Sequence, residues 1–119
     1  MDLQHMMNQI KQRSDFDRVG MILAHNGVVR GTSRDGRKVS GLRVSVDHDK
    51  LQRILDRERQ TPGIVEISIE IAEDRDLSVG DDVMVLIVAG DIRDTVISVL
   101  ERTLNAVKAT VTQKTEYFV

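Results

Sequence analysis

Four basic residues stand at positions where a cation could do chemistry: Arg30, Arg93, Lys108 and Lys114. Arg30 and Arg93 each follow a glycine turn closely, and the two lysines lie beyond the last expected helix. Guanidinium and ammonium groups bind carboxylates and phosphates and can neutralise charge that develops in a reaction. These residues therefore predict a site that binds an anion or stabilises negative charge.

Three of these four residues also have an ordinary structural explanation. Arg30 lies near the entrance of an expected hairpin, where a solvated arginine is common. Lys108 and Lys114 lie near a helix C-terminus, where lysine interacts favourably with the helix dipole. Arg93 differs, because a cation in the first turn of a helix opposes the dipole by about 0.3 to 1 kcal/mol. An anionic ligand explains Arg93 better than helix stability does.

The sequence offers no thiol nucleophile and no metal site. It contains no cysteine, so any sulfur chemistry must use sulfur supplied by another molecule. The three histidines, His5, His25 and His48, share no metal-ligand spacing. His48 lies in an Asp-His-Asp segment that is better explained as a helix cap. We therefore expect neither a metal nor an organic cofactor.

Composition excludes several classes of partner. The chain has 119 residues, with 17 basic and 19 acidic side chains interspersed and a net charge of -2. It has no basic stripe of the kind that duplex phosphates require, so nucleic acid is not an expected partner. The N-terminal segment lacks the apolar region of a signal peptide, and no stretch approaches the roughly 20 apolar residues of a membrane span. We expect a cytoplasmic protein with no membrane partner.

The expected strands and helices together predict an α+β fold. We expect a single domain over residues 1–119, because no linker, repeat or low-complexity tract divides the chain. The expected architecture is a mixed or antiparallel sheet packed by helices. Residues 1–14 form an N-terminal helix or extension that rests on the surface. The other expected elements are a strand at 19–24, a hairpin from 28–32 to 39–46, a helix capped by Asp47 or Asp49, strands at 64–71 and 83–89, and a final helix from about Asp91.

Two of these strands differ in pattern. Residues 64–71 alternate between apolar and polar side chains, which predicts a half-buried strand. Residues 83–89 are an unbroken apolar run, which is typical of a central strand covered on both faces. The hairpin is predicted from the Asp35-Gly36 dipeptide, because this pair favours the tight turns that join antiparallel strands.

Three groups of residues, in order along most of the chain, resemble one known family. They are Gly20, Gly27 and Arg30; then Leu77-x-Val79-Gly80-Asp81, a Val-rich strand and Arg93; and finally Lys108 with Lys114-Thr115-Glu116. Together they are similar to the large, catalytic subunit of molybdopterin synthase, the MoaE family. The resemblance runs from about Val19 to Glu116, and it implies a MoaE-like α/β hammerhead fold.

The resemblance also implies a function and a role for each basic residue. A molybdopterin synthase transfers sulfur from the C-terminal thiocarboxylate of a small ubiquitin-like (MoaD-like) subunit to cyclic pyranopterin monophosphate, in molybdenum cofactor biosynthesis. Lys108 and Lys114 are then the expected catalytic residues, with Lys108 nearest the thiocarboxylate. Arg30 and Arg93 are the expected substrate-binding residues. Lys108 could act as an acid or base if partial burial lowered its pKa.

Helix geometry adds a prediction about assembly. Arg93 and Lys108 are fifteen residues apart, which is roughly 22 Å along a continuous helix at about 1.5 Å per residue. Both cannot contact one small ligand within one chain. If both serve one pocket, as the resemblance implies, Arg93 must come from a second copy, which predicts a homodimer with composite sites and, with two small subunits, a heterotetramer.

Departures from the family pattern leave an alternative open. Ile92 occupies the place of the family's histidine, no Pro or Trp precedes Lys114, the two lysines are six residues apart rather than seven, and the sequence lacks the usual C-terminal tail. The alternative is a non-catalytic MoaE-like homologue that binds a ubiquitin-like partner or a pterin without turnover. A small α+β dimer unrelated to pterins is the third possibility, and it requires the ordered motifs to be coincidence.

Overall fold

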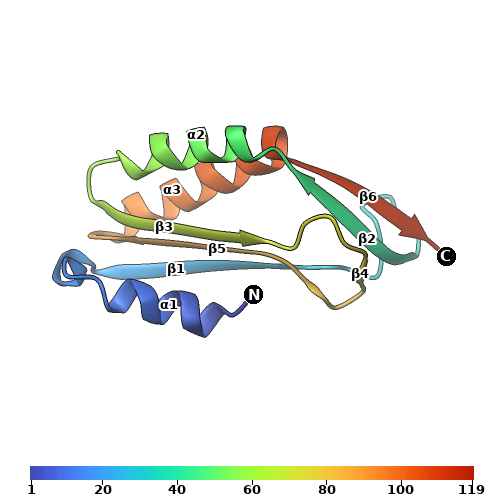
Figure 1. Ribbon diagram of the computed structural model, residues 1–119, viewed down its shortest axis with the longest axis horizontal. Coiled ribbons are helices and arrows are strands. Elements are labelled where there is room, and N and C mark those ends of the chain that lie inside the picture. The colour runs from blue at the N-terminus through green and yellow to red at the C-terminus, as the bar shows by residue number, and fades with distance from the viewer.

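The computed structural model describes residues 1–119, which form an elongated molecule with extents of 49 × 25 × 23 Å (Figure 1). It is an α+β fold, as the sequence predicts. In chain order the elements are α1 (Leu3–Lys11), the 3₁₀-helix η1 (Phe16–Arg18), β1 (Met21–Val28), β2 (Val39–Val46), α2 (His48–Arg59), β3 (Ile64–Ile71), β4 (Leu77–Ser78), β5 (Asp82–Gly90), α3 (Arg93–Ala106), the π-helix η2 (Val107–Val111) and β6 (Thr112–Phe118).

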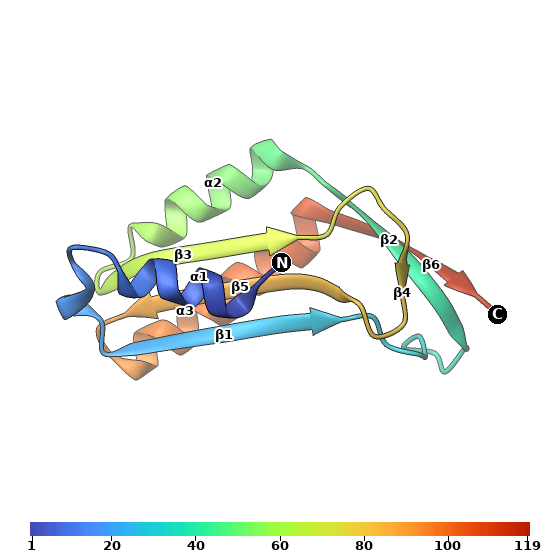
Figure 2. The same cartoon turned by 60° about the horizontal axis from the view of Figure 1, so that its bottom comes forward.

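The larger of two sheets has helices on both faces. Its strand order is β1-β5-β3, and both pairs are antiparallel. Figures 1 and 2 show α1 on one face of this sheet and α2 with α3 on the other. Helix α1, expected within residues 1–14, buries Met6 and Ile10 against the sheet. The buried face of this helix therefore belongs to one of the molecule's hydrophobic cores.

Strand β5 lies at the centre of the larger sheet, as its unbroken apolar run predicts. Met84, Leu86 and Val88 pack in the core beneath α2 and α3. Their neighbours Val85, Ile87 and Ala89 pack in the core beneath α1. Because successive side chains of a strand point to opposite faces, a strand buried on both faces needs an apolar residue at every position.

One buried carboxylate links α2 to α3, in addition to the core that both helices share. Asp47 caps α2 by accepting a hydrogen bond from the Lys50 amide at 3.1 Å. Glu58, near the end of α2, is 3% exposed and lies 2.7 Å from Arg102 of α3. The hydrogen bonds from Arg102 lower the pKa of the Glu58 carboxyl, so the pair stays charged at neutral pH.

The predicted hairpin is mostly wrong. The turn at Asp35-Gly36 is present, with Gly36 at φ +86°, but only one bridge, between Thr32 and Lys38, joins its two sides. Strand β2 pairs instead with β4 and β6 in a second antiparallel sheet of order β4-β2-β6. The reason is that β1 ends at Val28 and the Val29 backbone hydrogen-bonds to Gly80 and Asp81, whereas β6 pairs with β2 along most of its length.

The second sheet projects from one end of the first (Figure 1). Its small core contains Val29, Leu42, Val44, Ala72 and Leu77. Gly41 lets β4 approach β2, because a β-carbon there would lie 2.4 Å from the Leu77 carbonyl oxygen. The chain passes from β5 through α3 and η2 and then enters the second sheet as β6.

Candidate functional site

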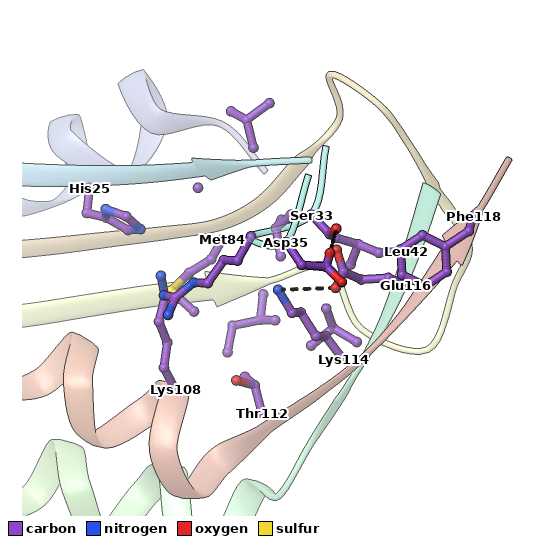
Figure 3. Close-up of a pocket in the computed structure, with 16 residues that line it drawn as sticks. His25, Ser33, Asp35, Leu42, Met84, Lys108, Thr112, Lys114, Glu116 and Phe118 are labelled. Carbon is purple, nitrogen blue, oxygen red and sulfur yellow. Dashed lines mark hydrogen bonds and ion pairs between the residues drawn. The ribbon is translucent and has the colours of Figure 1, made fainter. Parts of the chain in front are cut away.

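A pocket of about 660 Å³ lies between the end of α3, strand β1 and the second sheet (Figure 3). This volume is within the range of about 300 to 1,000 Å³ for small-molecule sites. Both lysines that the sequence singles out, Lys108 and Lys114, line it. The pocket therefore joins two residues that come from different secondary-structure elements.

Lys108 reaches the pocket because the chain widens into the π-helix η2 after α3. Val107 and Val111 at its ends are 0% and 3% exposed and belong to the main core. With these two valines buried, the side chain of Lys108 between them is exposed, and Figure 3 shows it pointing into the pocket. Short π-helical segments of this kind are frequent at functional sites.

Lys114 reaches the same pocket from strand β6. Thr112, Lys114, Glu116 and Phe118 all line the pocket, because residues two apart on a strand share one face. Lys114 pairs with Val44 of β2, which also lines the pocket. The Lys114 Nζ lies 3.9 Å from the Glu116 carboxylate (Figure 3), which is a long and weak ion pair.

The opposite wall contains a histidine that the sequence alone does not mark as a site residue. His25 of β1 lines the pocket, and Figure 3 shows it at the end near Lys108. Burial lowers the pKa of His25, and the positive charge of Lys108 lowers it further. At physiological pH a neutral imidazole can accept a hydrogen bond from a ligand or donate one to it.

The loop between β1 and β2 adds a further cation and an acid. Arg34 and Asp35 both line the pocket. The Ser33 hydroxyl donates a hydrogen bond to Asp35, and this bond lowers the pKa of the Asp35 carboxyl. The pocket thus contains three permanent cations, Arg34, Lys108 and Lys114, against two carboxylates. Such an excess favours an anionic ligand.

Arg30 and Arg93 lie outside this pocket. Arg30 is exposed, and its Nε donates to the Thr32 carbonyl oxygen at 2.8 Å. Arg93 is exposed at the first position of α3, at the other end of the helix from Lys108. The prediction that Arg93 and Lys108 of one chain cannot share a ligand is therefore consistent with the geometry. Lys108 is also exposed, so the partial burial that an acid–base role requires is absent in the single chain.

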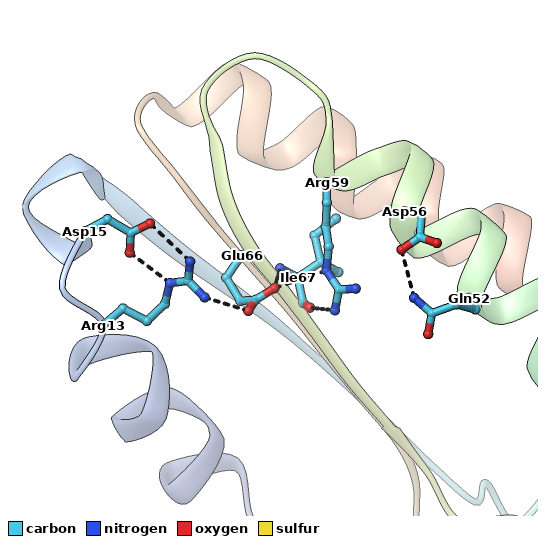
Figure 4. Close-up of polar contacts among 7 residues, drawn as sticks. All are labelled: Arg13, Asp15, Gln52, Asp56, Arg59, Glu66 and Ile67. Carbon is cyan, nitrogen blue, oxygen red and sulfur yellow. Dashed lines mark hydrogen bonds and ion pairs between the residues drawn. The ribbon is translucent and has the colours of Figure 1, made fainter.

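A second hollow, between α1, α2 and β3, has a different character. It is lined in part by Arg13, Arg59 and Glu66. The Glu66 carboxylate lies 2.8 Å from Arg13 and 3.1 Å from Arg59, and Arg13 also contacts Asp15 at 2.9 Å (Figure 4). Because these charges satisfy one another, this hollow joins the two helical layers across the edge strand β3 and offers little to a charged ligand.

Two further observations concern the whole chain. No group of three or more His, Cys, Asp or Glu side chains is placed to hold a metal ion. None of the helices is both long enough and apolar enough to span a membrane.

Comparison with protein families and known structures gives one family. The family model described as MoaE protein matches residues 1–110. Lys108 lies within the matched residues and Lys114 lies beyond them. No curated protein sequence matches the chain significantly.

Several solved structures share the fold. Molybdopterin synthase from Staphylococcus aureus aligns with a TM-score of 0.81 and 19% identity, over 100% of this chain and 86% of that one. Molybdopterin cofactor biosynthesis protein E from Burkholderia multivorans aligns with a TM-score of 0.77 and 20% identity, over 100% of this chain and 84% of that one. The complex of subunits 1 and 2 of the molybdopterin-converting factor from Helicobacter pylori aligns with a TM-score of 0.73 and 13% identity, over 100% of this chain and 84% of that one. At these identities the likeness concerns the fold alone.

Proposed function

The chain belongs to the MoaE protein family, and from this premise we propose that it is the large, catalytic subunit of a molybdopterin synthase. The observation that supports this most directly is the convergence of Lys108 and Lys114, from two different elements, on one cationic pocket. A structural neighbour is a complex of two subunits of molybdopterin-converting factor, which supports a small-subunit partner for this chain. A cytoplasmic location accords with this role.

The proposed reaction transfers sulfur from the C-terminal thiocarboxylate of a small ubiquitin-like subunit to cyclic pyranopterin monophosphate. The partner supplies the sulfur nucleophile, which accords with the absence of cysteine in this chain. Both the tail of the partner and the substrate phosphate are anions. Lys108 faces the thiocarboxylate, and Lys114 binds negative charge beside it, so both stabilise the charge that develops during attack.

The proposed assembly is a homodimer with composite sites, extended to a heterotetramer by two small subunits. Arg93 stands at the opposite end of α3 from Lys108, so it can serve such a pocket only when a second copy presents it. Arg30 comes from the loop beside the pocket and binds substrate together with Arg93. The pocket of one chain is then completed by its partner.

One observation favours the alternative, a non-catalytic homologue. Ile92, at the position of the family's histidine, is 59% exposed and caps α3 without a side-chain hydrogen bond. An isoleucine there supplies neither a proton nor a charge to a neighbouring site. Under this alternative the fold and the binding of the ubiquitin-like tail persist, but turnover is lost.

A single-turnover experiment distinguishes the catalytic subunit from the non-catalytic homologue. The chain is mixed with thiocarboxylated small subunit and cyclic pyranopterin monophosphate, and both molybdopterin formation and small-subunit binding are measured. We expect product at a rate far above that of the mixture without this chain. Binding without product selects the non-catalytic homologue, and the absence of both contradicts either form of the proposal.

A further inference from the structure

Two of the three cations in the pocket have no carboxylate partner. Arg34 makes no hydrogen bond or ion pair through its side chain, and Lys108 makes no ion pair, although both line the same space. The two acids of the pocket are engaged elsewhere, since Asp35 accepts from the Ser33 hydroxyl and Glu116 faces Lys114. Unpaired like charges repel, and a bound anion removes that repulsion.

The turn that carries Arg34 is closed by its own hydrogen bonds. Ser33 is 7% exposed, its amide donates to the Arg37 carbonyl oxygen at 2.9 Å, and its hydroxyl accepts from the Arg37 amide at 3.1 Å. The Gly36 amide donates to the Ser33 carbonyl oxygen at 3.0 Å, with Gly36 in the left-handed region. The backbone of Arg34 is therefore held in place, which reduces the ordering needed when a ligand binds.

The same turn is fastened to the end of β6. The Arg37 guanidinium carbon lies 3.6 Å above the centre of the Phe118 ring, which is cation–π geometry. The Val119 amide also donates to the Lys38 carbonyl oxygen at 3.1 Å. Since β6 carries Lys114, these contacts fix the position of the Arg34 turn relative to that lysine.

We propose that Arg34 is an anion-binding residue of this pocket that takes a phosphate group, and that Arg37 and Phe118 position it. The planar guanidinium can donate two parallel hydrogen bonds from different nitrogens to two phosphate oxygens, a fixed geometry that the single ammonium nitrogen of lysine lacks. The identity of the ligand rests on the proposed function, under which the phosphate is that of cyclic pyranopterin monophosphate. Arg34 comes from the same chain as the two lysines, so this part of the site does not depend on a second copy.

The direct test is a titration of the protein with inorganic phosphate, followed by the backbone amide resonances of residues 33–37 and 112–118. We expect saturable shifts in the wild type and about tenfold or more weaker binding in Arg34→Gln, because a charge-assisted hydrogen bond is lost. Arg75→Gln is the matched control, since Arg75 is exposed, unpaired and outside the pocket. A wild type without saturable shifts, or an Arg34→Gln variant that binds as the wild type does, overturns the proposal.

The positioning role has its own test. Phe118→Leu keeps an apolar side chain but removes the ring, so it should weaken phosphate binding less than Arg34→Gln does. The double variant should bind no more weakly than Arg34→Gln alone, because Phe118 acts only through the Arg34 turn. Losses that simply add would show that Phe118 contributes independently, which contradicts this role.

The sulfur-transfer assay distinguishes this inference from the proposed function. We expect Arg34→Gln to raise KM for the pterin substrate with little change in kcat, since phosphate binding is shared by the ground and transition states. If Arg34→Gln transfers sulfur with an unchanged KM, Arg34 does not bind the substrate, and the proposed function still stands. If phosphate binding depends on Arg34 but the wild type transfers no sulfur, the anion site stands and the proposed function is wrong.

Discussion

At the scale of single residues, the pocket combines groups that the sequence indicates with groups that it does not. Lys108 and Lys114 could be selected because they match a family pattern near the end of the chain. His25 and Arg34 could not, because each has an ordinary local sequence and acquires its place only when β1, the β1–β2 loop and β6 come together. The alternation of β1 would have placed His25 on the same face as Leu23, but not beside a lysine.

His25 should make stability depend on pH. Its pKa is lowered in the folded protein by burial and then by Lys108, so below about pH 6.5 the unfolded chain takes up a proton first. The contribution of neutral His25 to stability is therefore complete above that pH and is lost as the pH falls through the lowered value. His25→Gln should unfold with a weaker pH dependence than the wild type between about pH 7 and 5.

The measurement is urea denaturation at a series of pH values, and the difference between wild type and variant isolates His25 from the other histidines. Lys108→Ala should remove only part of the dependence, because burial is the larger cause. An identical pH dependence in wild type and His25→Gln would show that His25 is not in the environment described.

At the scale of elements, hydrophobic patterning predicted the strands with buried faces and missed the one that carries Lys114. Strand β5 is apolar at nearly every position, so its central place was evident. Strand β6 presents Thr112, Lys114 and Glu116 to the pocket, and its other face is polar too, so no apolar alternation marks it. The hairpin prediction was wrong for a related reason, since the best partner of β2 is a strand that the pattern does not reveal.

Leu86→Asp tests the place of β5. Leu86 is fully buried at the centre of the larger sheet, and an unpaired carboxylate there should destabilise the protein by more than about 4 kcal/mol, which is comparable with the whole stability of a small domain. Ile97→Asp is the control, because Ile97 is 43% exposed on α3 and should change stability by less than about 1 kcal/mol. Thermal and urea unfolding measure both. A Leu86→Asp protein with wild-type stability contradicts the assignment of β5 as the central strand.

At the scale of the whole molecule, the pocket of one chain lacks Arg93, which lies at the far end of α3 and which we propose as part of the site. The proposed homodimer supplies it, and sedimentation at micromolar concentration should give twice the 13.4 kDa of one chain. A sharper test mixes two impaired variants, Lys108→Ala and Arg93→Ala, by subunit exchange. Each mixed dimer regains one site with both residues intact, so activity should return.

The matched control for this experiment mixes Lys108→Ala with Lys114→Ala. Because both lysines line the pocket of the same chain, every site in that mixed dimer lacks one of them and activity should stay low. A monomer in sedimentation, or no recovery in the first mixture, contradicts the composite site.

The rate of sulfur transfer in one turnover, measured for wild type, Lys108→Ala and Lys108→Arg, tests whether Lys108 makes this pocket catalytic. Lys108→Ala should be slower by a factor on the order of 100 or more with nearly unchanged melting, because a positioned charge is deleted. If Lys108→Arg retains activity, Lys108 acts through its positive charge. If Lys108→Arg loses activity, the reaction requires proton transfer by Lys108 or its exact geometry. Lys11→Ala, an exposed lysine in the last turn of α1, should react as the wild type does. A Lys108→Ala protein that transfers sulfur at the wild-type rate contradicts the catalytic role of Lys108. A wild type that transfers none from a competent small subunit contradicts the proposed function.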